Sequence, residues 1–351
     1  MYLEEDLDLV LKGVPSLEGK LLGSTVLLTG AGGFLGRYFV AVIKKLNSEH
    51  PDNPVKLIAN DVFITSKQEF ETDLDPNILW IIGDASLSLN YEEKFDYIIH
   101  AAGIASPKFY KANPLETIDV SVGVTKLLLE RARKDSSRVL FFSSSEIYGD
   151  PTEGNVPTPE SYKGYVSIRG ERACYDESKR LGETLCWVYE NYYSVFVCAV
   201  RPFNVYGPGM LPTDARVLPN FASQVSRNLP LSIYNNGNQT RTFCYITDAL
   251  VGFLKVLLDS EKPDVYNVGN PSPEIGMKDL ALKVLEISNS NAGIEIVEYP
   301  DSYPGDEPNR RCPDISKLSS NLGFQPQVSL NEGLTKFLNW AEENYGKIDF
   351  Q

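Results

Sequence analysis

Short apolar runs alternate with longer amphipathic segments over the first two hundred residues of the chain. Six apolar runs predict strands, at 24–30, 55–63, 77–85, 95–103, 137–145 and 195–207. In three other segments apolar residues recur every three to four positions, which predicts helices over 33–47, 113–134 and 170–193. Strands that alternate with helices form a parallel sheet covered on both faces. The pattern therefore predicts an α/β fold with a doubly wound parallel sheet.

The pattern changes after about residue 200. Proline, glycine and asparagine become denser there, and the apolar segments become shorter. We expect residues 201–351 to form mainly a smaller substrate-binding lobe, interleaved with the last strands of the sheet. Residues 23–200 would then form the main domain, and residues 1–22 an amphipathic extension before its first strand.

Composition and charge narrow the classes of function. The 351 residues carry a formal net charge of −14, which disfavours a general nucleic-acid binder because such proteins need basic surface for phosphates. Five cysteines without CxxC spacing and two distant histidines argue against a disulfide framework and a metal site. No apolar run approaches the roughly 20 residues of a membrane span, and the N-terminus is acidic where a signal peptide would be basic. We therefore expect a cytoplasmic protein without a bound metal.

The first chemical motif is TGAGGFLG, between the first predicted strand and the first predicted helix. Gly30 allows a tight turn, Gly33 lets backbone approach a pyrophosphate, and Gly36 lets the helix pack closely on the strand. The first helical turn, with Phe34 and Leu35, supplies free N–H groups for phosphates. Three glycines alone are weak evidence. The strand–loop–helix context makes them a dinucleotide-binding motif and the sheet a Rossmann-type sheet.

An acidic residue follows in the place that such a site requires. Asp61 ends the second predicted strand, 25 residues after Gly36. A carboxylate there can accept hydrogen bonds from the adenosine ribose and repel a 2′-phosphate, which favours NAD over NADP. Arg37, directly after the glycine loop, is a signal in the other direction because it could meet a 2′-phosphate.

The second motif is YDESK, with Tyr175 and Lys179 one turn apart on a predicted helix. An ammonium group beside a tyrosine hydroxyl favours the phenolate and lowers its pKa, and an oxidised nicotinamide ring acts in the same direction. The pair is therefore a candidate base for a hydroxyl proton near neutral pH. Tyr-Lys pairs on surface helices are common, so the motif gains its weight from the glycine loop and from SSSEIYG about 30 residues upstream.

The stretch SSSEIYG places Glu146 at the end of a predicted buried strand. A carboxylate among apolar neighbours is costly unless it has partners or a chemical task. Glu146 is therefore either a structural carboxylate that caps a turn or a catalytic group.

Together these motifs resemble the extended short-chain dehydrogenase/reductases that act on nucleotide sugars. The resemblance runs from about Ser24 to Asn344 and includes GDA at Gly83, HAAG at His100, RPFNVYGPG, QTRTFCYITD and NRRCPDISKLSSNLGFQP. Two stretches, GERACYDESKRLGETL and GMLPTDARVLPNF, are most similar to the UDP-glucuronate decarboxylase (UDP-xylose synthase) group. The resemblance implies a Rossmann-type fold with a smaller C-terminal lobe, NAD as cofactor and a UDP-sugar as substrate.

The resemblance also implies roles for individual residues. Besides the glycine loop, the residues implied for NAD binding are Asp61, Asp84, Ala85, Ala101, Ala102, Gly103, Tyr175 and Lys179. Those implied for catalysis are Ser144, Ser145, Glu146, Tyr175, Lys179 and Arg241. Those implied for holding the nucleotide, diphosphate or sugar are Asn204, Arg216, Tyr234, Arg241 and Arg311.

The implied reaction is decarboxylation of UDP-glucuronate through a transient 4-ketone, with NAD recycled. Tyr175 takes the proton from the sugar 4-hydroxyl, near Ser144, as C4 is oxidised. The β-keto acid then loses carbon dioxide beside Ser145, C5 is protonated and C4 is reduced. Glu146 positions water or handles the C5 proton. Arg241 lies near the carboxylate-bearing carbon or binds only the diphosphate.

Other activities remain open on the same motifs. In a nucleotide-sugar 4,6-dehydratase Glu146 would abstract the C5 proton, whereas a 4-epimerase needs no glutamate there. Ser145 counts against the dTDP-glucose dehydratases, which have aspartate before the glutamate, but not against the GDP-mannose dehydratases. A non-catalytic NAD sensor would be expected to lose the Tyr-Lys pair. Val120 and Val124 replace an asparagine and a threonine of the family pattern, which leaves the exact substrate open.

The predicted helices 113–134 and 170–193 carry broad apolar faces. In relatives the corresponding helices form a two-fold four-helix interface, so the resemblance implies a homodimer. The alternative is that each helix buries its apolar face within its own subunit.

Overall fold

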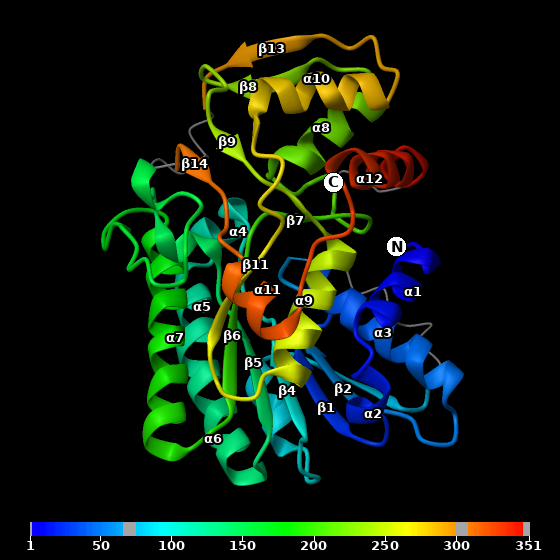
Figure 1. The fold of residues 1–351 in the computed structure, drawn as a ribbon, viewed down its shortest axis with the longest axis vertical. Helices are drawn as coiled ribbons and strands as arrows, with labels where there is room; N and C mark the ends of the chain where they lie inside the picture. The colour runs from blue at the N-terminus through cyan, green and yellow to red at the C-terminus, as the bar shows by residue number, and fades with distance from the viewer. Residues whose placement is uncertain (1, 66–74, 300–307, 347–351) are drawn as a thin grey trace.

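The computed structural model describes residues 2–65, 75–299 and 308–346 (Figure 1). Its centre is a sheet of seven parallel strands in the order β11-β6-β5-β4-β1-β2-β3. The strands are β1 Thr25–Thr29, β2 Lys56–Asp61, β3 Ile78–Ile82, β4 Tyr97–His100, β5 Arg138–Phe142, β6 Val197–Pro202 and β11 Val265–Val268. This order confirms the doubly wound Rossmann-type sheet, whose direction of winding reverses between β1 and β4. Ligands bind such sheets at the carboxyl ends of the strands beside that reversal.

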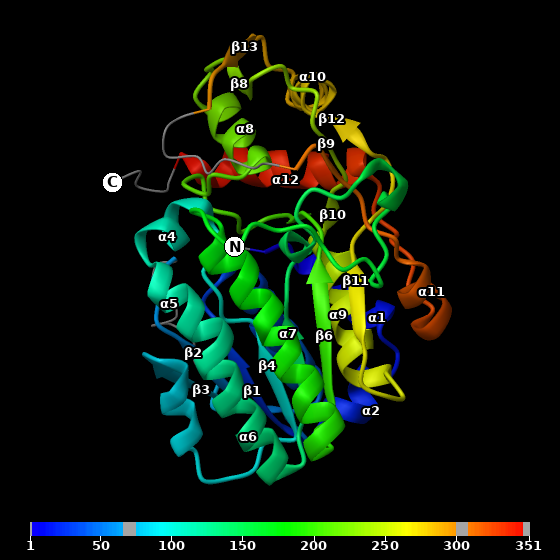
Figure 2. The same cartoon turned by 90° about the vertical axis from the view of Figure 1, so that its left-hand side faces the viewer.

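Helices cover both faces of the sheet, as the sequence pattern requires. On one face α5 (Pro114–Asp119), α6 (Thr125–Asp135) and α7 (Ala173–Tyr193) lie side by side (Figure 2). On the other face lie α3 (Phe34–Glu49) and α9 (Ile246–Asp259) (Figure 1). Consecutive residues of a strand point to opposite faces of the sheet and so belong to different apolar cores. Leu28 and Leu140 belong to one core, and Leu27 and Val139 belong to the other. This alternation is the two-residue period of a strand buried on both faces.

The predicted helix 113–134 is wrong in one respect, because it is not continuous. A π-helical segment, η2 (Val120–Val124), separates α5 from α6. The Val120 carbonyl oxygen is hydrogen-bonded to His100 Nε2 at 3.1 Å, and Nδ1 of the same ring lies 2.7 Å from Thr29 Oγ1. Burial, then the positive charge of Lys179, lowers the pKa of His100 to about 3, although the Val120 carbonyl opposes this shift. The widened turn thus gives a buried, neutral histidine its second hydrogen-bond partner.

The predicted strand 195–207 is also interrupted. It is divided into β6 and the short β7 (Val205–Tyr206), which pairs with β10 (Cys244–Tyr245) and not with the central sheet. Asn204 stands at the break with φ of 40°, in the left-handed region that asparagine tolerates better than most residues. Here the chain leaves the sheet for the smaller lobe.

The smaller lobe lies beyond the carboxyl ends of the strands (Figure 1). It contains α8 (Val217–Ser226), α10 (Met277–Ile287), α12 (Leu330–Tyr345) and the parallel pair β8 (Leu231–Tyr234) and β13 (Ile294–Val297). A three-stranded sheet adds β9 (Thr240–Arg241), β12 (Ile275–Gly276) and β14 (Arg310–Arg311). Between elements of the smaller lobe the chain returns to the central sheet. It supplies the edge strand β11 there, and α9 and α11 (Ser316–Leu322) pack beside the sheet.

The N-terminal extension joins the two parts of the molecule. It forms α1 (Glu4–Gly13) and α2 (Leu17–Leu21), and α1 packs on α9 and α3 with Leu7 and Val10 buried. Asp6 is fully buried and accepts hydrogen bonds from Tyr245 Oη at 2.8 Å and from Lys336 Nζ of α12 at 3.3 Å. Within the described ranges, no helix is both long and apolar enough to cross a membrane.

Candidate functional site

The glycine loop is shaped to receive a pyrophosphate. Gly30 has φ of +76°, and a Cβ there would lie 2.6 Å from the backbone nitrogen of Ala102. Gly36 has no room for a Cβ either, because its place is taken by the Gly30 carbonyl. Gly33 is the N-cap residue of α3 and faces an open cleft. The close turn, the bare backbone and the helix N-terminus together fit the diphosphate of NAD.

Asp61 fixes the loop and still has capacity for a ligand. Its Oδ2 accepts the Gly32 N–H at 2.8 Å, and its Oδ1 accepts the Phe63 N–H at 2.7 Å. Each carboxylate oxygen can accept more than one hydrogen bond. The carboxylate is therefore held in place at the end of β2 with acceptor sites left over for ribose hydroxyls.

The expected cofactor residues are only partly brought together. Those lining the cleft are Gly30, Gly33, Phe34, Leu35, Gly36, Ala101 and Gly103. Outside this lining lie Asp61, Asp84, Ala85, Ala102, Tyr175 and Lys179. Asp84 is exposed and caps the short helix η1 (Ala85–Asn90) by accepting the Ser86 N–H at 2.8 Å, and Ala85 is buried. Arg37, Arg216 and Asp214 line the cleft as well, and Asp214 pairs with Arg216.

Tyr175 and Lys179 are both buried on the first turns of α7. Lys179 Nζ donates to the Phe142 carbonyl at the end of β5 at 2.7 Å and lies 5.9 Å from the centre of the Tyr175 ring. The Tyr175 ring stacks on that of Tyr110, and its hydroxyl bonds with Ser144. The pair therefore lies where β5 ends, as the motif requires.

The expectation of a lowered tyrosine pKa is wrong for the groups present. Burial raises the pKa of Tyr175 to about 12, although the hydrogen bond from Ser144 opposes the shift. Burial also lowers the pKa of Lys179 to about 8. Burial of both side chains disfavours the phenolate of Tyr175 and the ammonium of Lys179. At their separation, the attraction between these two charges is too weak to offset that desolvation.

Glu146 lies in the short helix η3 (Ser145–Tyr148), directly after β5. Both of its carboxylate oxygens accept hydrogen bonds from Arg311, one of them at 2.9 Å, and Arg172 also donates to it. Burial alone would raise its pKa, but Arg311, Arg172 and then Arg241 hold it well below the usual range. Glu146 is therefore an ionised carboxylate clamped between arginines that are distant in sequence.

The sequence interpretation missed two residues beside Glu146. Arg172 precedes α7, and its Nε lies 3.5 Å from Asp176 Oδ2. Asp176 is 7% exposed, and its Oδ1 has no hydrogen-bond partner in the described structure. Burial and then the charge of Glu146 raise its pKa. Their spacing could have identified them, because Arg172 and Asp176 are four positions apart, a separation that brings side chains together on a helix, and Tyr175 lies between them in sequence.

A cavity between the lobe and the sheet collects most of the expected substrate residues; we call it the substrate cavity. Its lining includes Glu146, Tyr175, Asn204, Arg216, Tyr234, Arg241 and Arg311, together with Arg172. It shares Ala105, Met210 and Arg216 with the glycine-loop cleft, so the two spaces are neighbours. Ser145 is buried and lines neither of them.

The expected substrate residues Arg216, Tyr234 and Arg241 come from separate elements of the smaller lobe. The guanidinium of Arg241 on β9 donates to the carbonyl oxygens of residues 240, 308 and 309. Arg216 pairs with Asp214, with Nε–Oδ distances of 2.9 and 3.0 Å. Tyr234 stacks on Tyr299 with ring centres 4.9 Å apart. Hydrogen bonds to carbonyl oxygens and to Asp214 fix the orientation of these guanidinium groups, so that their remaining N–H groups can bind an anion.

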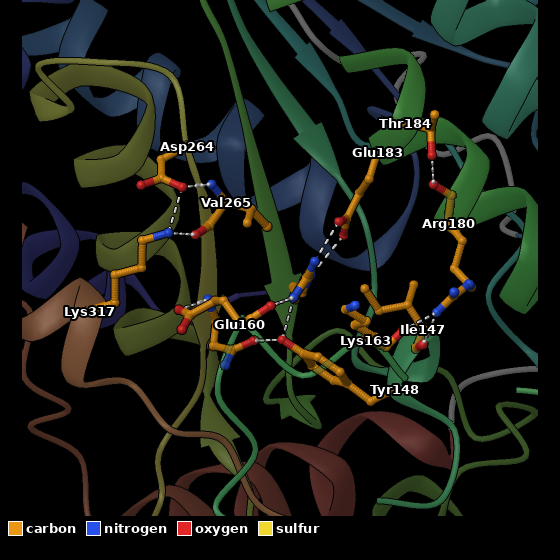
Figure 3. A network of polar contacts seen from close by, with 12 residues as sticks. Ile147, Tyr148, Glu160, Lys163, Arg180, Glu183, Thr184, Asp264, Val265 and Lys317 are labelled. Atoms are coloured by element: carbon orange, nitrogen blue, oxygen red, sulfur yellow. Dashed lines mark hydrogen bonds and ion pairs between the residues drawn. The ribbon is translucent and has the colours of Figure 1, made fainter. Parts of the chain in front are cut away.

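A buried polar network fixes η3 against α7 (Figure 3). Arg201 of β6 donates to both carboxylate oxygens of Glu183 on α7, at 2.8 and 2.6 Å, and to Tyr148 Oη at 2.6 Å. Tyr148 Oη in turn donates to Asn267 Oδ1 of β11 at 2.7 Å. Tyr148 is two residues from Glu146, and Glu183 is one turn from Lys179. The network thus positions the two elements that carry the candidate acid–base groups.

The same network reaches the segment that carries Arg311. Asn267 Nδ2 donates to the carbonyl of Asp314, three residues after Arg311, at 2.9 Å. Arg180 Nη1 donates to the carbonyl of Ile147 at 3.0 Å, a second link between α7 and η3 (Figure 3). Hydrogen bonds therefore fix the relative positions of η3, α7 and the segment that carries Arg311 around Glu146.

Comparison with known proteins identifies relatives of this arrangement. Residues 26–269 match the model of the NAD dependent epimerase/dehydratase family. The chain is 39% identical over 310 residues to UDP-glucuronic acid decarboxylase 3 of Arabidopsis thaliana, covering 88% of this chain and 86% of the relative.

Solved structures agree with the fold. A dTDP-glucose 4,6-dehydratase from Streptomyces venezuelae with NAD bound is similar with a TM-score of 0.79 and 25% identity, covering 92% of this chain and 98% of that chain. A UDP-glucuronic acid 4-epimerase from Bacillus cereus, in complex with UDP-glucuronic acid and NAD, has a TM-score of 0.76 and 26% identity, covering 92% and 100%. The similar proteins thus include a decarboxylase, a dehydratase and an epimerase.

Proposed function

Because the chain belongs to the NAD dependent epimerase/dehydratase family, we propose that it decarboxylates UDP-glucuronate to UDP-xylose with NAD as a recycled cofactor. The curated relatives at 34–39% identity that carry the name UDP-glucuronic acid decarboxylase support this choice of activity. We assign NAD to residues 23–200 and the nucleotide sugar mainly to residues 201–351, of which 300–307 and 347–351 lie outside the described residues.

The observation that carries the proposal is the charge of the substrate cavity. Its described lining contains four arginines, Arg172, Arg216, Arg241 and Arg311, against one carboxylate, Glu146. The whole chain has a net charge of −14, so this excess of positive charge is local. UDP-glucuronate has a diphosphate and a sugar carboxylate, and both need cationic partners when water is excluded.

The residues near Tyr175 account for the first proton transfer. NAD, when bound in the cleft, supplies a reversible two-electron oxidation of C4, and its positive ring opposes the effect of burial on Tyr175. Tyr175 takes the 4-hydroxyl proton, and Ser144 hydrogen-bonds the reacting hydroxyls. Lys179, bound to the Phe142 carbonyl, stabilises the phenolate. The residues act by holding atoms in line and by moving one proton.

The residues around Glu146 suit the loss of carbon dioxide. Once C4 is a ketone, the C6 carboxylate belongs to a β-keto acid, and the ketone accepts the electron pair of the broken C5–C6 bond. Glu146 stays ionised, keeps Arg172 and Arg311 oriented, and holds a water near C5. Ser145 is buried beside Glu146, and we propose that it supports this turn.

The alternative as a 4,6-dehydratase is less well supported. That reaction needs Glu146 to take the C5 proton, whereas the flanking arginines keep its pKa below the usual range and make it a weak base. Decarboxylation needs no base at C5. The dehydratase and the epimerase remain the activities that the assay must distinguish.

We also propose a homodimer through the face formed by α5, α6 and α7. Large apolar side chains on this face are exposed: Leu115, Ile118, Leu127, Leu181 and Trp187. The three helices lie side by side on the outside of the subunit (Figure 2). An isologous contact of two such faces would bury these side chains. The expected result is a dimer in light scattering that Leu115→Glu with Leu181→Glu converts to a monomer.

We place the protein in the cytoplasm, a proposal supported by its thiols. All five cysteines lie in the described part of the chain and are free. Four of them are buried. Unpaired cysteines suit a reducing compartment.

The test of the proposed activity is a substrate panel. The protein with NAD is incubated separately with UDP-glucuronate, UDP-glucose and GDP-mannose, and products are identified by proton NMR. We expect UDP-xylose from UDP-glucuronate only. Conversion of UDP-glucuronate to its 4-epimer, or turnover of a neutral hexose alone, would contradict the proposal.

A further inference from the structure

A second cavity, of about 840 Å³, shares Glu146 and Arg172 with the substrate cavity. These two side chains are therefore a common wall between the two spaces. The rest of its described lining is formed by Gly149, Asp150, residues 165–173, Asp176 and Pro308. Its volume is many times the roughly 30 Å³ that one water occupies. None of the steps derived above uses this space, which we call the second cavity.

Among the described residues that line the second cavity, Asp176 is a buried carboxylate with an incomplete set of partners. It is 7% exposed, with Oδ2 3.5 Å from Arg172 Nε and Oδ1 without any hydrogen-bond partner in the described structure. Oδ1 is itself closed off from the cavity, but the side chain as a whole is 10% exposed and lines the cavity, so water there can reach the rest of the carboxylate. Burial and the nearby charge of Glu146 raise its pKa, so that Asp176 holds a proton more readily than an exposed aspartate.

The outer side of the second cavity is open to exchange with solvent. Its wall over residues 165–170 is a loop, in which Tyr165 is 80% and Ile168 79% exposed. Ser167 and Arg169 of the same loop are also exposed. Water from bulk solvent thus has a route to Asp176 and Glu146 that does not pass through the space a nucleotide sugar would fill.

Decarboxylation with a closed redox cycle has a proton requirement. The C5–C6 bond breaks, carbon dioxide leaves, and the electron pair moves onto C5 and the C4 ketone oxygen as an enolate. A C5–H bond then forms, so one proton is taken from solvent in each turnover. Tyr175 only borrows the 4-hydroxyl proton and returns it. With the substrate in place, the front of its cavity is occupied, and this additional proton needs another way in.

We propose that the second cavity is the proton entry route and that Asp176 relays the proton, through water at Glu146, to C5. Asp176 is a positioning and relay residue in this scheme, since it does not line the substrate cavity. Water at the shared wall passes its proton to C5, takes one from Asp176, and the carboxylate is reloaded from the cavity water. The inference rests on the proposed decarboxylation and specifies where its proton comes from.

The first test replaces Asp176 by asparagine, with Glu177→Gln as control on the same helix. Glu177 is the next residue, loses the same charge and does not line the second cavity. For Asp176→Asn with UDP-glucuronate we expect kcat to fall at least tenfold, KM to change less than twofold, and the solvent deuterium isotope effect on kcat to rise at least twofold. The control should match wild type. A fall in kcat with an unchanged isotope effect would show a merely structural role for Asp176 and overturn the proposal.

The second test blocks the route without changing Asp176. Ser167 is exposed and lines the second cavity, whereas Ser161 is exposed on the same stretch of chain and does not. Ser167→Trp should lower kcat several-fold and raise the solvent isotope effect, and Ser161→Trp should do neither. Wild-type rates and isotope effects in Ser167→Trp would overturn the proposal. Failure of the wild-type protein to decarboxylate UDP-glucuronate would instead overturn the proposed function, so the two failures are distinguishable.

Discussion

Removal of one buried hydroxyl should show how much the network behind the site stabilises it. Tyr148 is 1% exposed, and its Oη accepts from Arg201 Nη1 at 2.6 Å and donates to Asn267 Oδ1 at 2.7 Å. Tyr148→Phe keeps the ring, which packs against Phe203, and removes both hydrogen bonds. No new volume is introduced, so the change isolates the polar contribution.

The expected loss follows from those two bonds. A hydrogen bond to a charged group contributes about 1.5–3 kcal/mol, and an acceptor left buried without a partner costs about 1–3 kcal/mol. Arg201 keeps its two bonds to Glu183 and one to the carbonyl of Glu160, which limits the damage on that side. We therefore expect the free energy of unfolding to fall by about 2–4 kcal/mol.

Urea denaturation followed by far-UV circular dichroism measures this difference. The midpoint should decrease for Tyr148→Phe while the dependence on urea stays the same, because the buried surface is unchanged. Tyr192→Phe is the control, since Tyr192 is 71% exposed and its replacement should stay within about 0.5 kcal/mol. A loss below about 0.5 kcal/mol in Tyr148→Phe would mean that the network adds no stability beyond what solvent provides.

Three further predictions concern single groups of the site and the sheet. Tyr175→Phe should lower kcat by about 10²–10⁴ while NAD still binds in a fluorescence titration; a smaller loss would remove Tyr175 from the acid–base role. Gly30→Ala should weaken NAD binding at least tenfold, because its Cβ would lie 2.6 Å from the Ala102 backbone; unchanged affinity would contradict the assigned pyrophosphate loop. His100, with a pKa lowered to about 3 by burial, should stay neutral from pH 8 to pH 5 in nitrogen-15 NMR, with the signal assigned through His50→Gln. Since the unfolded chain takes up this proton near pH 6.5 and the folded chain does not, the stability present above pH 6.5 is lost as the pH falls toward 3; a midpoint near 6 in the folded protein would contradict the assignment.

The strand and helix pattern predicts the sheet well, because apolar periodicity is set by burial on two faces. The interruptions depend on tertiary contacts that periodicity does not record. The π segment at Val120 lies where the Val120 carbonyl meets His100, which is 20 residues away in sequence. The break at Asn204 depends on pairing of β7 with a strand some 40 residues later.

The candidate site divides in the same way. Motifs whose residues are close in sequence, such as Tyr175 and Lys179, could be predicted, because helix spacing alone places them on one face. The clamp on Glu146 could not, since Arg311 reaches it from 165 positions away. The direction of the Tyr175 pKa was also mispredicted, because the desolvation of a side chain depends on burial, which spacing does not reveal.

The most direct test of the account is a single isotope experiment. UDP-glucuronate labelled with carbon-13 at C6 is incubated with the protein and NAD, and labelled carbon dioxide, UDP-xylose and the absorbance of reduced nicotinamide are followed together. We expect one labelled carbon dioxide for each UDP-xylose formed and no net change in absorbance. Consumption of UDP-glucuronate with the label retained in the sugar would contradict it.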